Sequence, residues 1–146
     1  MDRKQEILPA VAAAIFNDKG EVLLQKRRDV NKWCIISGHV EFGETVEHAM
    51  LREIAEETNV KARIVRLIGL YSSPDSQVYH YEERTVQYIT SYFEARLMES
   101  IAEGFANEET GELRFFPVNG LPGDMAMINP NWLEDALNRG SVPFVR

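Results

Sequence analysis

The chain has 146 residues, of which 45% are hydrophobic and 27% are charged, and its formal net charge at pH 7 is −7. This length predicts one globular domain over residues 1–146, and the composition excludes an intrinsically disordered chain. An acidic chain without a block of basic residues is poorly suited to bind a nucleic acid polymer or an anionic membrane through its overall charge. Binding a phosphate-containing partner therefore requires a local feature that offsets the repulsion between the acidic chain and the phosphate.

Cysteine usage and apolar runs indicate the compartment. The single cysteine, Cys34, excludes an intrachain disulfide and favours a reducing environment. No apolar run reaches the ~20 residues that a membrane-spanning helix requires. The small apolar stretch 7–16 is interpreted as a buried strand and not as a signal-peptide core, because residues 2–6 carry no net side-chain charge. These features predict a cytoplasmic protein without a membrane partner.

Hydrophobic patterning predicts strands interrupted by two helices. The predicted strands cover residues 10–16, 22–27, 60–71, 86–97 and 112–116. One helix is predicted over 45–58, with Asn59 just past its end, and a second follows Asn131 and stops at Gly140. This order indicates an α/β fold with a mixed sheet and helices packed against it.

The predicted helix 45–58 carries carboxylates on a face that is otherwise apolar. Its apolar stripe consists of Val46, Met50 and Ile54. At about 100° per residue, Glu53, Glu56 and Glu57 share one side of the helix, and Glu57 falls inside the apolar stripe. Like charges packed against a sheet are costly unless a cation lies among them, and carboxylate oxygens are hard ligands that suit Mg²⁺. A solvated acidic face is the alternative, but it does not explain the position of Glu57.

The segment 38–60 resembles the sequence signature of the Nudix family, G-x5-E-x7-R-E-U-x-E-E-x-G-U, where U is aliphatic. Gly38 begins the segment, Glu44 follows after five residues, and after seven more the chain reads Arg52-Glu53-Ile54-Ala55-Glu56-Glu57-Thr58-Asn59-Val60. Asn59 replaces the expected Gly, and Asn tolerates positive φ better than most residues. The resemblance extends over nearly the whole chain and implies a Nudix-type α/β/α sandwich with a mixed β-sheet.

The resemblance implies a hydrolase in which water attacks the phosphorus of a diphosphate bond. It also implies dependence on Mg²⁺, with Mn²⁺ as a substitute ion, and the roles of the family's residues carry over by position. The implied metal ligands are the backbone carbonyl of Gly38 and the carboxylates of Glu53, Glu56 and Glu57. Glu53 is alternatively the general base. Arg52 is expected to orient Glu53 and Glu56 without touching the substrate, and Glu44 to support the loop and the N-terminus of the helix.

Residues outside the signature supply further candidates. The acidic segment 107–112 is predicted to provide another metal ligand, Glu109, with Glu108 as the next choice, against the alternative of a solvated acidic loop. Arg27, at the end of a predicted strand, is expected to contact a substrate phosphate, against the alternative of a polar strand end. His39 is expected to reach the substrate. Three tyrosines are candidates for stacking on a base, against a role in the core: Tyr71, Tyr79 and Tyr81.

The substrate class stays open within the family. The leading hypothesis is a (deoxy)nucleoside triphosphate cleaved to the monophosphate and pyrophosphate, and the alternative is ADP-ribose or another nucleoside-diphosphate derivative. Pro74 and Tyr79 lie near, but not at, the positions that mark the ADP-ribose and dinucleoside-polyphosphate subfamilies. Ser37 and His39 depart from the usual Pro-Gly-Gly loop and keep a non-catalytic nucleotide sensor as an alternative. Isomerase chemistry on an isoprenoid diphosphate is a further alternative. The sequence argues against it, because Cys34 has no evident acid/base partner. A homodimer is expected by analogy with the family.

Overall fold

The computed structural model describes residues 4–146, so residues 1–3 of the predicted domain lie outside the described part. Its larger sheet, sheet A, follows the order β4-β1-β7-β5-β9, and β6 also pairs with β7. The strands of sheet A are β1 (Lys4–Ile15), β4 (Ile36–His39), β5 (Ala62–Tyr71), β6 (Val78–His80), β7 (Arg84–Leu97) and β9 (Phe144–Val145). β1 is parallel to β7 and β5 is parallel to β9, whereas the other pairs are antiparallel. The predicted mixed sheet is confirmed.

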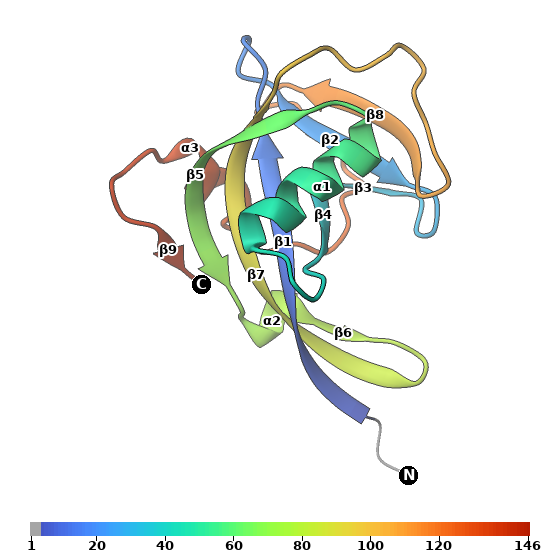
Figure 1. Cartoon of the computed structure of the whole chain (residues 1–146), viewed down its shortest axis with the longest axis vertical. Coiled ribbons are helices and arrows are strands. Elements are labelled where there is room, and N and C mark those ends of the chain that lie inside the picture. Colours follow the sequence, from blue (N-terminus) through green and yellow to red (C-terminus); the bar gives the residue numbers. More distant parts are fainter. Residues whose placement is uncertain (1–3) are drawn as a thin grey trace.

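A second, antiparallel sheet, sheet B, follows the order β3-β2-β8. Its strands are β2 (Val22–Arg27), β3 (Lys32–Cys34) and β8 (Thr110–Phe116). The helices are α1 (Val46–Thr58), α2 (Pro74–Gln77) and α3 (Trp132–Leu137). Figure 1 shows α1 crossing the long strands of sheet A, with sheet B gathered at one end of them. None of the helices in residues 4–146 is long and apolar enough to cross a membrane.

Sheet A is covered on both faces, and the small apolar residues of β1 pack in the cores on both sides. Val11, Ala13 and Ile15 face α1 and pack in a core with Met50 and Ile54 of that helix. The alternate residues Ala12 and Ala14 face the other way and pack in a core with Trp33, Tyr92 and Trp132. Because successive strand residues point to opposite faces, one short apolar run serves both cores. The predicted α/β fold with helices packed against a mixed sheet is thereby confirmed.

The ends of α1 agree with the sequence prediction. The Thr45 side chain caps the helix by accepting a hydrogen bond from the His48 backbone N at 3.1 Å. Asn59 follows the helix with φ 57°, the left-handed conformation in which Asn substitutes for Gly. The expected burial of Val46 is wrong, because this residue of the first turn is 39% exposed and lies outside the core that α1 forms with sheet A.

Other predicted boundaries are corrected by pairing between distant segments. β1 starts at Lys4, six residues earlier than expected, because its whole length pairs with residues 84–95 of β7. The strands β3 and β4 lie within residues 32–39, where the sequence predicted no strand. The last helix ends at Leu137 and not at Gly140, and Asn131 makes no side-chain cap hydrogen bond.

Candidate active site

The side chain of Glu53 lies directly against the backbone of Gly38. Gly38 lies in β4, held opposite Val11 of β1, and faces α1. A Cβ on this residue would lie 2.1 Å from Cδ of Glu53. Only glycine therefore lets the carboxyl group of Glu53 rest against the backbone of β4. This contact brings together two of the predicted metal-site residues.

Arg52 connects the acidic helix to the loop before it. Its Nε and Nη2 donate to the two carboxylate oxygens of Glu44 at 2.7 and 2.9 Å. Its Nη1 donates to Glu53 Oε1 at 3.0 Å and to Glu56 at 3.3 Å. Nη2 also donates to the backbone carbonyl of His39 at 3.0 Å. One planar guanidinium thus fixes three carboxylates and the end of β4, which a lysine could not do with the same geometry.

Glu44 completes this support at the start of α1. Its Oε1 accepts from the backbone N of Glu41 at 2.9 Å, and its side chain is only 9% exposed. The hydrogen bonds from Arg52, together with that from Glu41, lower the pKa of Glu44 to about 2. Glu44 in turn contributes most to raising the pKa of Arg52. The pair remains charged throughout the physiological range.

Glu57 is the buried carboxylate of the site. It is 5% exposed, and its Oε2 accepts a hydrogen bond from the hydroxyl of Thr110, the first residue of β8. The Thr110 hydroxyl also lies 2.8 Å from Oε1 of Gln25, a buried residue of β2. Residues from α1, β2 and β8 therefore meet at one carboxylate.

The loop before β8 brings Glu109 to Glu57. Asn107 Nδ2 donates to the backbone carbonyl of Glu56 at 3.1 Å, which ties the loop to the C-terminal turn of α1. Asn107 Oδ1 accepts from the backbone N of Glu109 at 2.9 Å and of Thr110 at 2.7 Å. The structure thus brings the carboxylate of Glu109, the first choice from this segment, next to that of Glu57. Gln25, Asn107 and Thr110 were not anticipated from the sequence, although two of them lie in the segment singled out as acidic.

The pKa values of the two inward-facing carboxyl groups are raised. Burial is the main cause for Glu53, whose pKa rises to about 7 although Arg52 opposes the change. Burial also raises the pKa of Glu57, the neighbouring Glu109 carboxylate adds to this, and the hydrogen bond from Thr110 opposes it. The charged forms of these two carboxyl groups are therefore destabilised, and a bound cation would stabilise them and lower both pKa values.

The two predicted substrate-binding residues lie on different sides of the site. Arg27, at the end of β2, is half-exposed, pairs with Asp29 at 2.8 Å and lies within electrostatic reach of Glu109. His39 is exposed and points away from α1, because it follows Gly38 in the strand and adjacent residues face opposite ways. Its ring stacks on Tyr88, with centroids 5.4 Å apart.

The donor set fits a hard divalent cation. All the candidate ligands are carboxylate or carbonyl oxygens, which Mg²⁺ and Mn²⁺ prefer over nitrogen or sulfur. Within residues 4–146, no group of three or more His, Cys, Asp or Glu side chains is arranged closely enough to hold a metal ion as it stands. Arg52 holds Glu53 and Glu56, while Thr110 holds Glu57. Ion binding would therefore require Glu56, whose side chain is 55% exposed, to turn away from Arg52.

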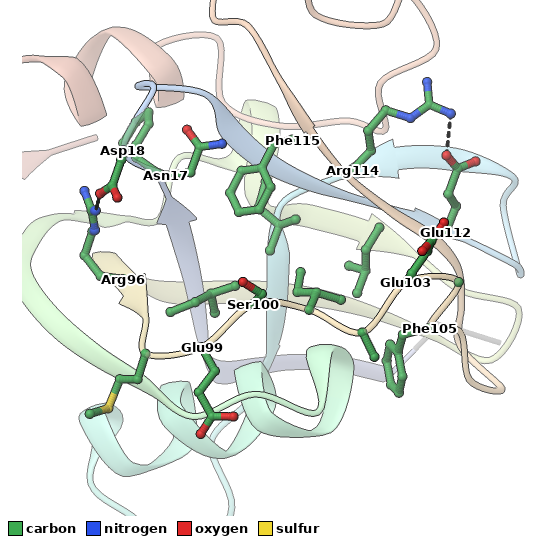
Figure 2. Close-up of a pocket in the computed structure, with 18 of the residues that line it drawn as sticks. Asn17, Asp18, Arg96, Glu99, Ser100, Glu103, Phe105, Glu112, Arg114 and Phe115 are labelled. Carbon is green, nitrogen blue, oxygen red and sulfur yellow. Dashed lines mark hydrogen bonds and ion pairs between the residues drawn. The ribbon is translucent and has the colours of Figure 1, made fainter.

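A cavity of about 830 Å³ lies elsewhere, between β8 and the loop that follows β7 (Figure 2). Two ion pairs lie on opposite sides of it, Arg96 with Asp18 and Arg114 with Glu112. None of the predicted site residues lines it. The acidic site is therefore distinct from this hollow, and its geometry comes from α1, β4 and the loop before β8.

The sequence profile of the NUDIX domain matches residues 6–136, which include every element of this site. The chain belongs to the NUDIX domain family. An ADP-ribose pyrophosphatase of Methanocaldococcus jannaschii is 35% identical over 118 residues, 78% of this chain and 65% of that protein. A putative 8-oxo-dGTP diphosphatase of Bacillus subtilis is 41% identical over 63 residues, 43% of this chain and 42% of that protein.

Solved structures of the family share the fold. The crystal structure of an ADP-ribose pyrophosphatase from Streptococcus suis matches with a TM-score of 0.73 and 20% identity, over 95% of this chain and 97% of that one. At this identity the similarity establishes the fold alone. The chain spans less than two thirds of the length of both relatives matched by sequence. The predicted Nudix-type fold is thus confirmed.

Proposed function

We propose that this Nudix chain is a Mg²⁺-dependent hydrolase that cleaves the diphosphate bond of a nucleoside diphosphate linked to a further group, with ADP-ribose as the first candidate. The observation that carries the proposal is the pair of inward-facing carboxyl groups on α1, Glu53 against Gly38 and Glu57 against Thr110. Two desolvated carboxyl groups beside each other are destabilising unless they bind a cation, and a cation among them would attract phosphate.

The roles of the chain's residues follow from their places. Glu57, Glu56, Glu53 and the Gly38 carbonyl would hold Mg²⁺, with Glu109 as a further ligand. When bound, this ion would polarise a phosphoryl oxygen and lower the pKa of water. If Glu53 is the base instead, its pKa of about 7 suits it to accept the proton of the attacking water while the anhydride P–O bond breaks. Arg52 holds Glu53 in position through Oε1.

Arg27 is proposed to bind the phosphates of the substrate. Its guanidinium pairs with Asp29 through Nε and Nη2 at 3.1 and 2.8 Å, and this fork has the geometry that also recognises a phosphate. Its place near Glu109 would put a cation at the edge of the acidic cluster. A phosphate bridging Arg27 and the metal would offset the repulsion from the net negative charge of the chain.

The second candidate substrate is a (deoxy)nucleoside triphosphate. The Bacillus subtilis relative, named for 8-oxo-dGTP, supports it. ADP-ribose comes first because the relative named for that substrate matches this chain over 118 residues, about twice as far. Both reactions break a diphosphate bond at the same set of carboxylates, so the substrate-binding surface decides between them.

A substrate panel tests the proposal. ADP-ribose, UDP-glucose, dGTP, 8-oxo-dGTP and diadenosine polyphosphates would be incubated with Mg²⁺ and the wild-type or Glu57→Gln protein, and the products resolved by anion-exchange chromatography. The proposal predicts a nucleoside monophosphate from at least one compound, dependent on Mg²⁺ and lost in Glu57→Gln. Binding without turnover of any compound would instead support a nucleotide sensor and would contradict the proposal.

A further inference from the structure

Four aromatic residues form a continuous strip on sheet A, on the face opposite α1. This aromatic strip consists of His39, Tyr79, Tyr81 and Tyr88. Tyr88 stacks on His39 at a centroid distance of 5.4 Å with 20° between the rings, and meets the edge of Tyr79 at 5.4 Å. Tyr79 lies parallel to Tyr81 at 6.3 Å, with 14° between the rings. The rings therefore extend from β4 across β7 to the strand β6 and the turn that follows it.

The strip begins in β4, beside the acidic site. Gly38 faces Glu53 on the α1 side, and the next residue, His39, places its ring on the opposite face, while the His39 carbonyl is bonded to Arg52. Between His39 and β7 lies Ala10, which pairs with His39 on one side and Thr90 on the other. Ala10 packs in one buried cluster with Tyr88 and Tyr79, so its small side chain forms part of the support beneath the strip. The strip is thus continuous with the acidic site through a single strand.

The tyrosines of the strip differ in exposure. Tyr88 is 8% exposed and its hydroxyl is bonded to that of Tyr81 at 2.9 Å, so it forms the base of the strip. Tyr79 is half-buried, and Tyr81 is 42% exposed. Tyr79 also lies within electrostatic reach of Arg27 and Cys34, which come from sheet B. The proposed phosphate-binding cation therefore lies close enough to the strip to act on Tyr79 electrostatically.

Polar groups adjoin the strip. The Thr90 hydroxyl donates to Oε1 of Gln77 at 2.7 Å, which fixes the direction of that amide. Both residues line a cavity of about 40 Å³ that continues along this face of sheet A towards α3. A planar group resting on the strip would therefore have an oriented amide at its edge.

We propose that the aromatic strip binds the base of the nucleotide substrate, with Tyr79 as the residue on which the base stacks. This inference rests on the proposed function for the identity of the ligand. Stacking uses the π-face that every base has, so the strip would favour nucleotides over base-free sugar phosphates and discriminate weakly among bases. An order of preference among bases would come from the Gln77 amide.

The test compares ligands with and without a base. The four ribonucleoside 5′-monophosphates and ribose 5-phosphate would be titrated calorimetrically, with Mg²⁺ present, into wild type, Tyr79→Ala and Tyr79→Phe. Wild type should bind at least one monophosphate about 5- to 150-fold more tightly than ribose 5-phosphate. Tyr79→Ala should lose most of this difference without weakening ribose 5-phosphate, and Tyr79→Phe should keep it. Leu70→Ala, on the opposite face of sheet A and 41% exposed, is the matched control.

The outcomes separate this inference from the proposed function. Equal binding of monophosphates and ribose 5-phosphate by wild type, no measurable nucleotide binding, or undiminished preference in Tyr79→Ala would overturn it. These measurements need no turnover, so base-dependent binding without hydrolysis would refute the enzyme proposal alone. With an active substrate, Tyr79→Ala should raise KM by a similar factor and leave kcat within about twofold, since the base lies away from the reacting phosphorus.

Discussion

Replacing Gly38 by alanine should disable the site while leaving the fold largely intact. The added Cβ would lie 2.1 Å from Cδ, 2.3 Å from Oε1 and 2.5 Å from Cγ of Glu53. Non-bonded carbon atoms approach each other to about 3.5 Å, so the carboxyl group must move by roughly 1.4 Å. That movement would also pull Glu53 Oε1 from Arg52, to which it is now bonded at 3.0 Å.

The expected magnitude follows from this displacement. A shift of about 1 Å in a reacting group can reduce the rate on the order of 10²-fold, so kcat/KM should fall by about that factor. Overpacking costs about 1–3 kcal/mol in a rigid core. The lower end applies here because the obstructing atoms belong to a side chain that can turn aside.

The assay combines kcat/KM on the preferred substrate with thermal unfolding. Gly123→Ala is the control, because a Cβ there meets nothing within 4 Å and its φ is not positive. The control should match wild type in both measurements. The reasoning would be refuted by a folded Gly38→Ala protein that keeps wild-type kcat/KM, since the approach of Glu53 to β4 would then be irrelevant to catalysis.

Three further predictions concern residues that support the site or the fold. Thr110→Val removes the hydroxyl that holds Glu57, and should weaken Mn²⁺ binding about 10- to 100-fold in calorimetric titration; unchanged affinity would contradict this role. In Arg52→Lys the ammonium group cannot reproduce the paired hydrogen bonds from Nε and Nη2 to Glu44, so kcat/KM should fall about 10- to 100-fold with a smaller change in KM. A change in KM alone would argue that Arg52 contacts the substrate instead. Asp135→Asn removes a buried carboxylate bonded to Arg146 at 2.7 Å, and in urea unfolding should lose about 1.5–3 kcal/mol at pH 7. Burial alone would raise the pKa of Asp135, but the hydrogen bonds from Arg146 and Tyr71, together with the charge of Arg146, outweigh burial and lower the pKa. This stabilisation is therefore present above the ordinary pKa of aspartate and disappears as the pH falls through the lowered value. The gap between wild type and variant should therefore close in acid, and a gap that persists there would show that packing, and not charge, is responsible.

The sequence was most informative where a local pattern has one structural solution. The position of Glu57 inside an apolar stripe predicted an inward-facing carboxylate, and it is 5% exposed. The predicted bounds 45–58 differ from α1 only at Thr45, which is the N-cap and not the first helical residue, and Asn59 marked the end of α1 because positive φ depends on local residue chemistry. These features need no knowledge of the neighbouring strands.

Contacts between distant segments could not be predicted in this way. Thr110 reaches Glu57 across 53 positions of the chain, and Asn107 reaches the Glu56 carbonyl across 51. Each is an unremarkable polar residue in its own segment. The strand β4 was likewise missed, because Ser37 and Gly38 interrupt its apolar run and only pairing with β1 makes it extended. The division of Gly38 and His39 between two faces became visible only with that strand.

The central claim is that the inward-facing carboxylates of α1 bind a divalent cation. Electron paramagnetic resonance of Mn²⁺, titrated into wild type, Glu57→Gln and Glu47→Gln, tests it most directly, because free Mn²⁺ gives a strong signal that binding attenuates. Glu47 lies on the exposed side of the same helix and provides a control with the same change in charge. The account predicts that wild type and Glu47→Gln bind alike and that Glu57→Gln loses at least one site. Equal binding by all three proteins, or none by wild type, would contradict it.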